Sequence, residues 1–123
     1  MRVRYLGVPD TPPDPLDGRY YFTPEQEYVV LELHVHSDGS FELRIEHSPR
    51  DLAGLFDGKY FEQVSDVIPS QWSVEIHPWG GLSMGPKEWI EGDFWERMME
   101  RDPDAEAAFA AVRDAILAED PIT

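Results

Sequence analysis

The clearest pattern of apolar and polar positions along the chain spans residues 28–46. Two segments, 28–36 and 41–46, alternate with a period of two residues, and Ser37-Asp38-Gly39 separates them. This period predicts two β-strands that each turn one apolar face toward a core. The apolar set is Val29, Leu31, Leu33, Val35, Phe41, Leu43 and Ile45, and the opposite set is Val30, Glu32, His34, His36, Glu42, Arg44 and Glu46.

The parity of these positions predicts the turn between the two strands. Residues that lie directly opposite each other across a strand pair share one face of the sheet. A two-residue turn would place Val35 opposite Glu42, whereas a three-residue loop with a left-handed Gly39 places Val35 opposite Phe41. The same register pairs His36 with Ser40, Leu33 with Leu43, His34 with Glu42, and Glu32 with Arg44.

A second hairpin is predicted around Trp79-Gly80-Gly81. Residues 72–77 alternate, and Leu82 and Met84 continue the apolar pattern after the turn. We expect Trp72, Val74 and Ile76 to face the core, and Ser73, Glu75 and His77 to face outward.

The N-terminal third predicts less regular structure. Residues 1–8 fit a strand with Val3 and Tyr5 on one face. Prolines at 9, 12, 13 and 15 predict an extended surface loop. Residues 18–22 fit a second, brief strand.

The segment after the first hairpin carries a helix-start signal. Ser48-Pro49-Arg50-Asp51 places a capping Ser before Pro, with an acid three residues after the Ser. We therefore expect a short helix over residues 51–56, ended by Asp57-Gly58. Residues 59–68 fit either a strand or a helical turn.

Two helices are predicted at the C-terminal end. Pro86 opens the first, and its apolar stripe contains Ile90, Phe94 and Met98, flanked by Trp95 and Met99. The first helix could break at Gly92-Asp93, because Asp93 and Glu96 have capping-box spacing. Asp102-Pro103 caps the second, which ends near Glu119 and has the core face Ala105, Phe109, Val112 and Ile116.

These elements predict an α+β fold in one domain covering residues 1–123. We expect an antiparallel sheet of hairpins, four to six strands in all, packed on one face by the two C-terminal helices.

The net charge of the chain indicates which classes of molecule it could bind. The chain has 25 Asp and Glu against 10 Lys and Arg, a net charge of −15. Such a charge repels nucleic acid and anionic membranes, and it attracts basic macromolecules. Residues 86–123 contain eleven acidic and four basic residues, although capping of the last helix accounts for some of these acids.

Composition excludes several classes of protein. A hydrophobic share of 41% and an aromatic share of 12% are too high for a disordered acidic tail. The absence of Cys excludes disulfides and Cys nucleophiles. No apolar segment resembles a signal peptide or a membrane span, so we expect a cytoplasmic protein, and no nucleotide or metal-loop motif indicates a cofactor.

Three of the four histidines form the first candidate site. His34 and His36 leave the same face of one predicted strand, and His77 could join them if the second hairpin lies alongside. This spacing resembles the His-x-His metal grip of cupin-like barrels, although Glu42 follows at a longer interval than the cupin pattern has. The alternative is that these are polar residues on a solvated sheet face, with His34 paired to Glu42.

Two other motifs have structural explanations. Gly81-Leu82-Ser83-Met84-Gly85 matches the nucleophile-elbow pattern, but every His precedes Ser83 and the strand before it belongs to a hairpin. Asp102-Pro103-Asp104 could suggest a divalent metal, but helix capping explains both acids. We therefore predict no catalytic residue and no metal site.

An exposed tryptophan forms the second candidate site. Trp79 lies at a predicted hairpin tip beside two glycines, where burial is least expected. Aromatic residues in such positions often anchor protein partners, and the alternative is that Trp79 folds back onto the helices. The predicted partner-binding set is Trp79, Glu75, Glu88, Glu91 and Asp93.

Two functions follow from these observations. The first is a non-catalytic acidic protein that docks onto a basic protein surface, as an immunity or antitoxin-type inhibitor of a toxin that acts on nucleic acid. The second is a metal-dependent or small-ligand enzyme that uses His34 and His36. The charge and the thin catalytic inventory favour the first, and the sequence leaves the oligomeric state open.

Overall fold

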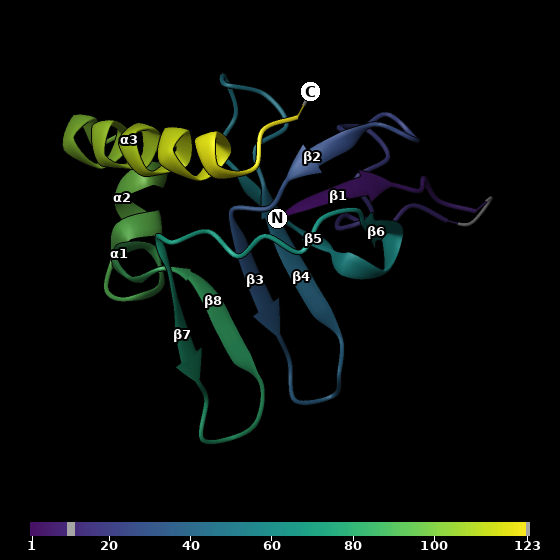
Figure 1. Ribbon diagram of the computed structural model, residues 1–123, viewed down its shortest axis with the longest axis horizontal. Coiled ribbons are helices and arrows are strands. Elements are labelled where there is room, and N and C mark those ends of the chain that lie inside the picture. Colours follow the sequence, from purple (N-terminus) through teal and green to yellow (C-terminus); the bar gives the residue numbers. More distant parts are fainter. Residues whose placement is uncertain (10–11, 123) are drawn as a thin grey trace.

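Two antiparallel sheets organise the molecule (Figure 1). The computed structural model describes residues 1–9 and 12–122, and within these ranges there are eight strands. The three-stranded sheet has the order β2 (Glu27–Val29), β1 (Arg2–Tyr5), β6 (Phe61–Gln63). The five-stranded sheet has the order β5 (Gly54–Asp57), β4 (Phe41–Ile45), β3 (Glu32–Val35), β8 (Leu82–Pro86), β7 (Trp72–Ile76).

The helices complete an α+β fold, as predicted. They are the short 3₁₀ helix η1 (Gly58–Tyr60) and the α-helices α1 (Lys87–Ile90), α2 (Phe94–Met99) and α3 (Pro103–Glu119). One apolar cluster lies between the two sheets and includes Tyr5, Leu43 and Phe61. A second joins the helices to the sheets and includes Trp89 and Phe109. The strands are thus divided between two sheets, with apolar packing on both sides of the larger one.

The predicted strand over residues 28–36 is broken in the middle. Val29, Val30, Leu31 and Glu32 are buried one after another, which no single strand with one buried face allows. The Val30 amide donates to the Met1 carbonyl at 2.9 Å, and the Leu31 amide donates to the Arg44 carbonyl at 2.8 Å. The chain therefore crosses from one sheet to the other here, and the prediction that Val30 and Glu32 face outward is wrong.

The first hairpin has the register predicted from parity. Glu32 pairs with Arg44, Leu33 with Leu43, His34 with Glu42 and Val35 with Phe41. The His36 amide donates to the Ser40 carbonyl at 2.8 Å, and Gly39 has a φ of 89°. The three-residue loop with a left-handed glycine is confirmed.

Two local predictions are wrong because tertiary contacts override them. The second half of the expected helix over residues 51–56 is instead part of strand β5, which pairs with β4 and places Phe56 opposite Leu43. The Ser48 hydroxyl accepts a bond from the Arg50 amide, but only in a turn. The expected strand over residues 18–22 is also a turn, in which the Tyr21 amide donates to the Gly18 carbonyl.

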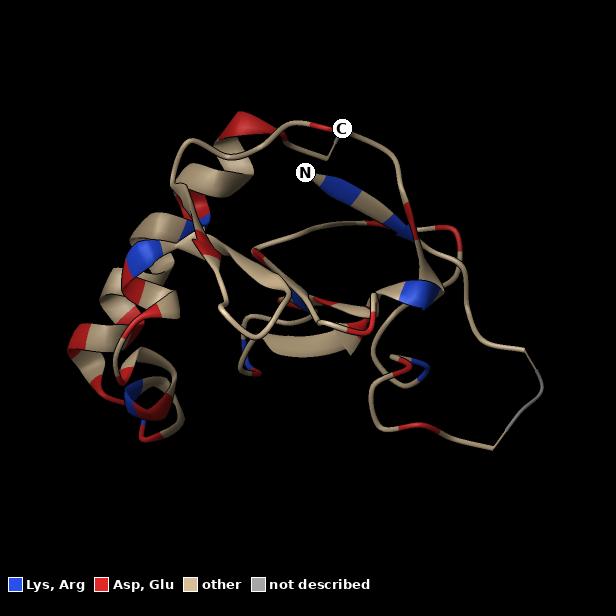
Figure 2. Ribbon diagram, turned by 90° about the horizontal axis from the view of Figure 1, so that it is seen from below, with Lys and Arg blue, Asp and Glu red and all other residues tan. Residues whose placement is uncertain are grey.

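The C-terminal helices follow the sequence pattern closely. The first predicted helix is split at Gly92-Asp93 into α1 and α2. Asp102 caps α3 by accepting a bond from the Asp104 amide, which confirms the predicted cap, and Asp104 lies in the first turn of the helix. Ala105, Phe109 and Ile116 are buried. Asp and Glu recur along the surfaces of the helices (Figure 2).

The turns of the two hairpins β3–β4 and β7–β8 lie against each other. Both turns point to the same end of the molecule, away from α3 (Figure 1). A Cβ atom placed on Gly80 would lie 3.0 Å from the Ser37 Cβ, and one placed on Gly81 would lie 2.3 Å from the Val35 carbonyl oxygen. Only glycines allow this approach.

We predict that Gly81→Ala destabilises the protein more than Gly39→Ala. Both glycines have similar left-handed φ angles, 87° and 89°, but a Cβ on Gly39 would meet nothing within 4 Å. Gly39→Ala should lower the free energy of unfolding by about 1–2 kcal/mol through backbone strain alone. Gly81→Ala should lose a further ~1–3 kcal/mol through overpacking. Urea unfolding measures both, and equal losses would show that the two turns do not touch.

We also predict a defined acid sensitivity at Asp17. A side-chain hydrogen bond from Arg19, helped by backbone amides, lowers the Asp17 pKa from 3.8 to about 2. Because the native pKa lies below the ordinary value, this contribution is complete above about pH 4 and is lost as the pH falls toward 2. Asp17→Asn should therefore be less stable than the parent protein at pH 6, and the gap should close by pH 2. A gap that stays constant over this range would contradict the assignment.

Candidate functional site

A polar row crosses the five-stranded sheet near the hairpin turns. Strand pairing places Glu42, His34, Ser83 and Glu75 side by side on four neighbouring strands. A cleft of about 350 Å³ opens over this row, a volume within the range of small-ligand sites. Its polar and aromatic lining is His34, His36, Glu42, His77, Trp79 and Ser83, and we call it the histidine cleft.

A part-buried chain of hydrogen bonds forms the floor of the histidine cleft. Ser83 Oγ lies 2.8 Å from His34 Nδ1 and 3.0 Å from His77 Nε2. His34 Nε2 lies 3.3 Å from a carboxylate oxygen of Glu32, a residue with 0% exposure. The histidines predicted to share one sheet face are thus brought together, with Ser83 between two of them.

Glu32 is held by three donors. Arg44 Nε donates to it at 2.9 Å, Trp95 Nε1 donates to it at 3.4 Å, and His34 is the third neighbour. The Arg44 guanidinium also stacks on the Trp95 ring, 3.8 Å from its centroid. A carboxylate buried this deeply requires such partners, because an unpaired charge in the interior is strongly destabilising.

The histidines do not form a metal grip. Among residues 1–9 and 12–122, no group of three or more His, Asp or Glu side chains is arranged to hold a metal ion. His34 and His77 each direct a nitrogen to Ser83, while His36 Nε2 bonds to Glu42 at 2.6 Å. The imidazoles therefore face hydroxyl and carboxylate partners instead of a common centre.

Hydrogen bonds link Ser83 to His34 and His34 to Glu32, which is the order of contacts in a catalytic triad. A hydroxyl bonded to an imidazole, itself oriented by a carboxylate, is the arrangement that activates nucleophilic serines. Here the Ser83 hydroxyl is engaged on both sides, and the residue is only 5% exposed. The geometry fixes the orientation of the imidazoles and does not present an oxygen for attack.

Trp79 is exposed at the turn of the second hairpin, with 75% of its surface open to solvent. It does not fold back onto the helices. Its indole stacks on the His77 ring, with centroids 4.9 Å apart and planes 11° apart, so one face of the indole is covered by His77.

The predicted partner-binding set is distributed over two regions. Glu88, Glu91 and Asp93 line one pocket of about 280 Å³ beside α1 and α2, and Glu75 lines a neighbouring one with Glu91. Trp79 lies at the turn of β7–β8, whereas α1 follows the other end of β8. The acids are therefore grouped with one another, but they do not surround the tryptophan.

The opposite face of the same hairpins is apolar and partly uncovered. Phe41, Val35, Leu82 and Ile76 form a continuous row across β4, β3, β8 and β7. Ile76 is 77% exposed and Val74 57% exposed, so the prediction that these two residues face the core is wrong. Trp72, at the other end of β7, does pack against both clusters. We call Phe41, Val35, Leu82, Ile76 and Val74 the apolar row.

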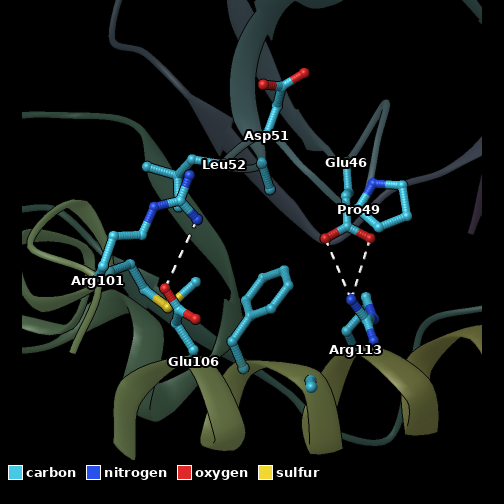
Figure 3. Close-up of a pocket in the computed structure, with 11 residues that line it drawn as sticks. Glu46, Pro49, Asp51, Leu52, Arg101, Glu106 and Arg113 are labelled. Atoms are coloured by element: carbon cyan, nitrogen blue, oxygen red, sulfur yellow. Dashed lines mark hydrogen bonds and ion pairs between the residues drawn. The ribbon is translucent and has the colours of Figure 1, made fainter. Parts of the chain in front are cut away.

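A further hollow lies between α3 and the loop after β4, and the charged side chains that line it form ion pairs with one another (Figure 3). Arg113 Nη1 lies 3.3 Å from Glu46, and Arg101 Nη1 lies 3.7 Å from Glu106. Each cation in this hollow of about 130 Å³ is already paired with a carboxylate of the chain. These pairs join α3 to the sheet and to the end of α2.

Sequence reasoning missed Glu32 and Ser83 as members of the site. The contact between Ser83 and His34 depends on β3 lying beside β8, which no local pattern specifies. The burial of Glu32 depends on the chain crossing at Val30 and Leu31. The run of four buried residues after Tyr28 includes one unexpected apolar residue, Val30, and this was the only signal available.

Comparison with protein-family models, curated proteins and solved structures gives no match for this chain. Within the part of the chain that the structure describes, no helix has the length and apolar character needed to cross a bilayer.

We predict that Glu32→Leu strongly destabilises the protein. The substitution leaves the Arg44 guanidinium, whose side chain is 13% exposed, without its carboxylate, and should lower the free energy of unfolding by about 3–5 kcal/mol. Glu62→Leu removes the more exposed partner of Arg4 and should change it by less than about 1 kcal/mol. Urea unfolding compares the two, and the double variant Glu32→Leu with Arg44→Met should regain part of the loss. Similar small effects at both sites would contradict the role of Glu32.

Proposed function

We propose that this protein is a non-catalytic acidic binding protein that docks onto a basic protein surface. Its partner is a toxin that acts on nucleic acid, and the protein serves as the cytoplasmic immunity or antitoxin-type inhibitor of that toxin. A surface that holds nucleic acid is basic, so an acidic protein can occupy the positions of the phosphates and block it.

The observation that carries this proposal is the partly uncovered apolar row on one face of the projecting hairpins, together with an exposed tryptophan at the turn of one of them. Ile76, Val74 and Trp79 are more than half exposed on hairpins that extend beyond the smaller sheet (Figure 1). Apolar and aromatic residues at such a site supply binding energy, and surrounding charges supply specificity and association rate.

The distribution of charge supports a basic partner. At least eight of the ten Lys and Arg side chains already form ion pairs with carboxylates of the same chain. The excess of negative charge is therefore left for other molecules. A second copy of the chain, also at −15, would be repelled over the same surface.

We predict that the protein neutralises a basic toxin domain encoded beside its own gene. Co-expression should restore growth of cells that produce the toxin domain, and the purified proteins should form a complex. Raising the salt concentration from 50 to 500 mM should slow association at least tenfold, because screening removes electrostatic steering.

A matched pair of variants tests the surface. Ile76→Asp should weaken the complex about tenfold or more, since it places a carboxylate in the apolar row. Ile68→Asp adds the same charge at another exposed isoleucine and should leave affinity within about twofold. The proposal would be overturned if neither salt nor Ile76→Asp weakened the complex. It would also be overturned if no protein encoded by a neighbouring gene bound this chain.

A further inference from the structure

The buried carboxylate of Glu32 fixes the protonation of the imidazoles above it. A carboxylate only accepts hydrogen bonds, so His34 Nε2 carries the hydrogen that faces Glu32. In neutral His34, Nδ1 is then bare and accepts the Ser83 hydroxyl hydrogen at 2.8 Å. Ser83 has no second hydrogen to give, so the 3.0 Å contact with His77 requires that His77 Nε2 donates.

The same reasoning identifies what the histidine cleft leaves for a ligand. Neutral His77 donates through Nε2, so its Nδ1 is an acceptor. His36 Nε2 faces the Glu42 carboxylate at 2.6 Å, so neutral His36 also keeps Nδ1 as an acceptor. The second carboxylate oxygen of Glu42 is a third acceptor. All three atoms belong to side chains that line the cleft. A ligand stacked on the free face of Trp79 is separated from His77 by the indole, so the acceptors it can use are those of His36 and Glu42, and they match a ligand that offers several N–H donors.

The carboxylates of the polar row and the exposed indole face of Trp79 favour a cationic ligand. Glu42 and Glu75 lie on either side of His34 and Ser83 in the polar row. The nearest cation of the larger sheet, Arg44, is already bound to Glu32 and stacked on Trp95. Trp79 is 75% exposed and covered on one face by His77, and a free indole face attracts planar cations.

We propose that the histidine cleft binds the guanidinium group of an arginine side chain, which the basic partner supplies. This inference rests on the proposed function and assigns the anchor residue of the partner. Guanidinium is planar, has five N–H donors and no acceptor, and stacks on aromatic faces. An ammonium group shares the charge but lacks the planar stack, so lysine binds more weakly at the same place.

The first test uses the isolated protein and a small probe. We expect N-acetyl-arginine-amide to shift the indole N–H resonance of Trp79 in ¹H–¹⁵N spectra, with the resonance assigned from Trp79→Phe. The matching lysine amide should bind at least threefold more weakly, and the uncharged citrulline amide should cause no shift. Equal shifts from arginine and citrulline, or no shift from arginine, would overturn the proposal.

The second test reads the imidazoles directly. Long-range ¹H–¹⁵N correlation at pH 8 should show the hydrogen on Nε2 of His34, His36 and His77. A hydrogen on Nδ1 of His36 would overturn the assignment of acceptors, and with it the proposal.

Matched variants connect the cleft to the ligand. Glu42→Gln should weaken arginine-amide binding about fivefold, whereas Glu100→Gln, which removes an exposed carboxylate at the end of α2, should leave it unchanged. The two proposals fail separately. Arginine binding without a neutralised toxin would remove the proposed function and keep the site. A complex that depends on Ile76 and is formed without arginine binding at Trp79 would keep the function and remove the site.

Discussion

The passage of the chain from one sheet to the other at Val30 and Leu31 is the constraint on which the rest of the structure depends. Each residue donates its amide to a different sheet, and their side chains enter different apolar clusters. The crossing turns Glu32 inward, where Arg44 and Trp95 join β3, β4 and α2 around one carboxylate. His34 and Ser83 then take their orientation from that carboxylate, so the floor of the histidine cleft is set by the path of the backbone.

Sequence reasoning succeeded where a local pattern was sufficient. The register of the first hairpin follows from the parity of Val35 and Phe41, and the start of α3 follows from the Asp102 cap. It failed where a distant partner decides the outcome. Residues 54–57 form a strand because β4 is beside them, and Val74 and Ile76 are exposed because the smaller sheet does not reach them. Neither neighbour is encoded within the segment itself.

For the candidate site as well, features set by local sequence could be predicted and features set by distant contacts could not. The common face of His34 and His36 and the exposure of Trp79 could be predicted from spacing and from the glycine turn. The hydrogen bonds through Ser83 could not, because they require the order of four strands in the sheet. The acidity of the chain also has two physical origins. Part of it caps helices and pairs with arginines inside the fold, and the remainder gives the surface its negative field.

Under the proposed function, the projecting hairpins carry recognition and the two apolar clusters carry folding. Ile76, Val74 and Trp79 contribute little to either apolar cluster, so their replacement leaves the core packing intact. Gly80 and Gly81, in contrast, hold the two turns together through contacts that admit no side chain. Substitution of the exposed residues can therefore leave the fold unchanged while the glycines keep the geometry of the turns. Under the proposed function, a lineage could change partners through a few surface substitutions and retain the same scaffold.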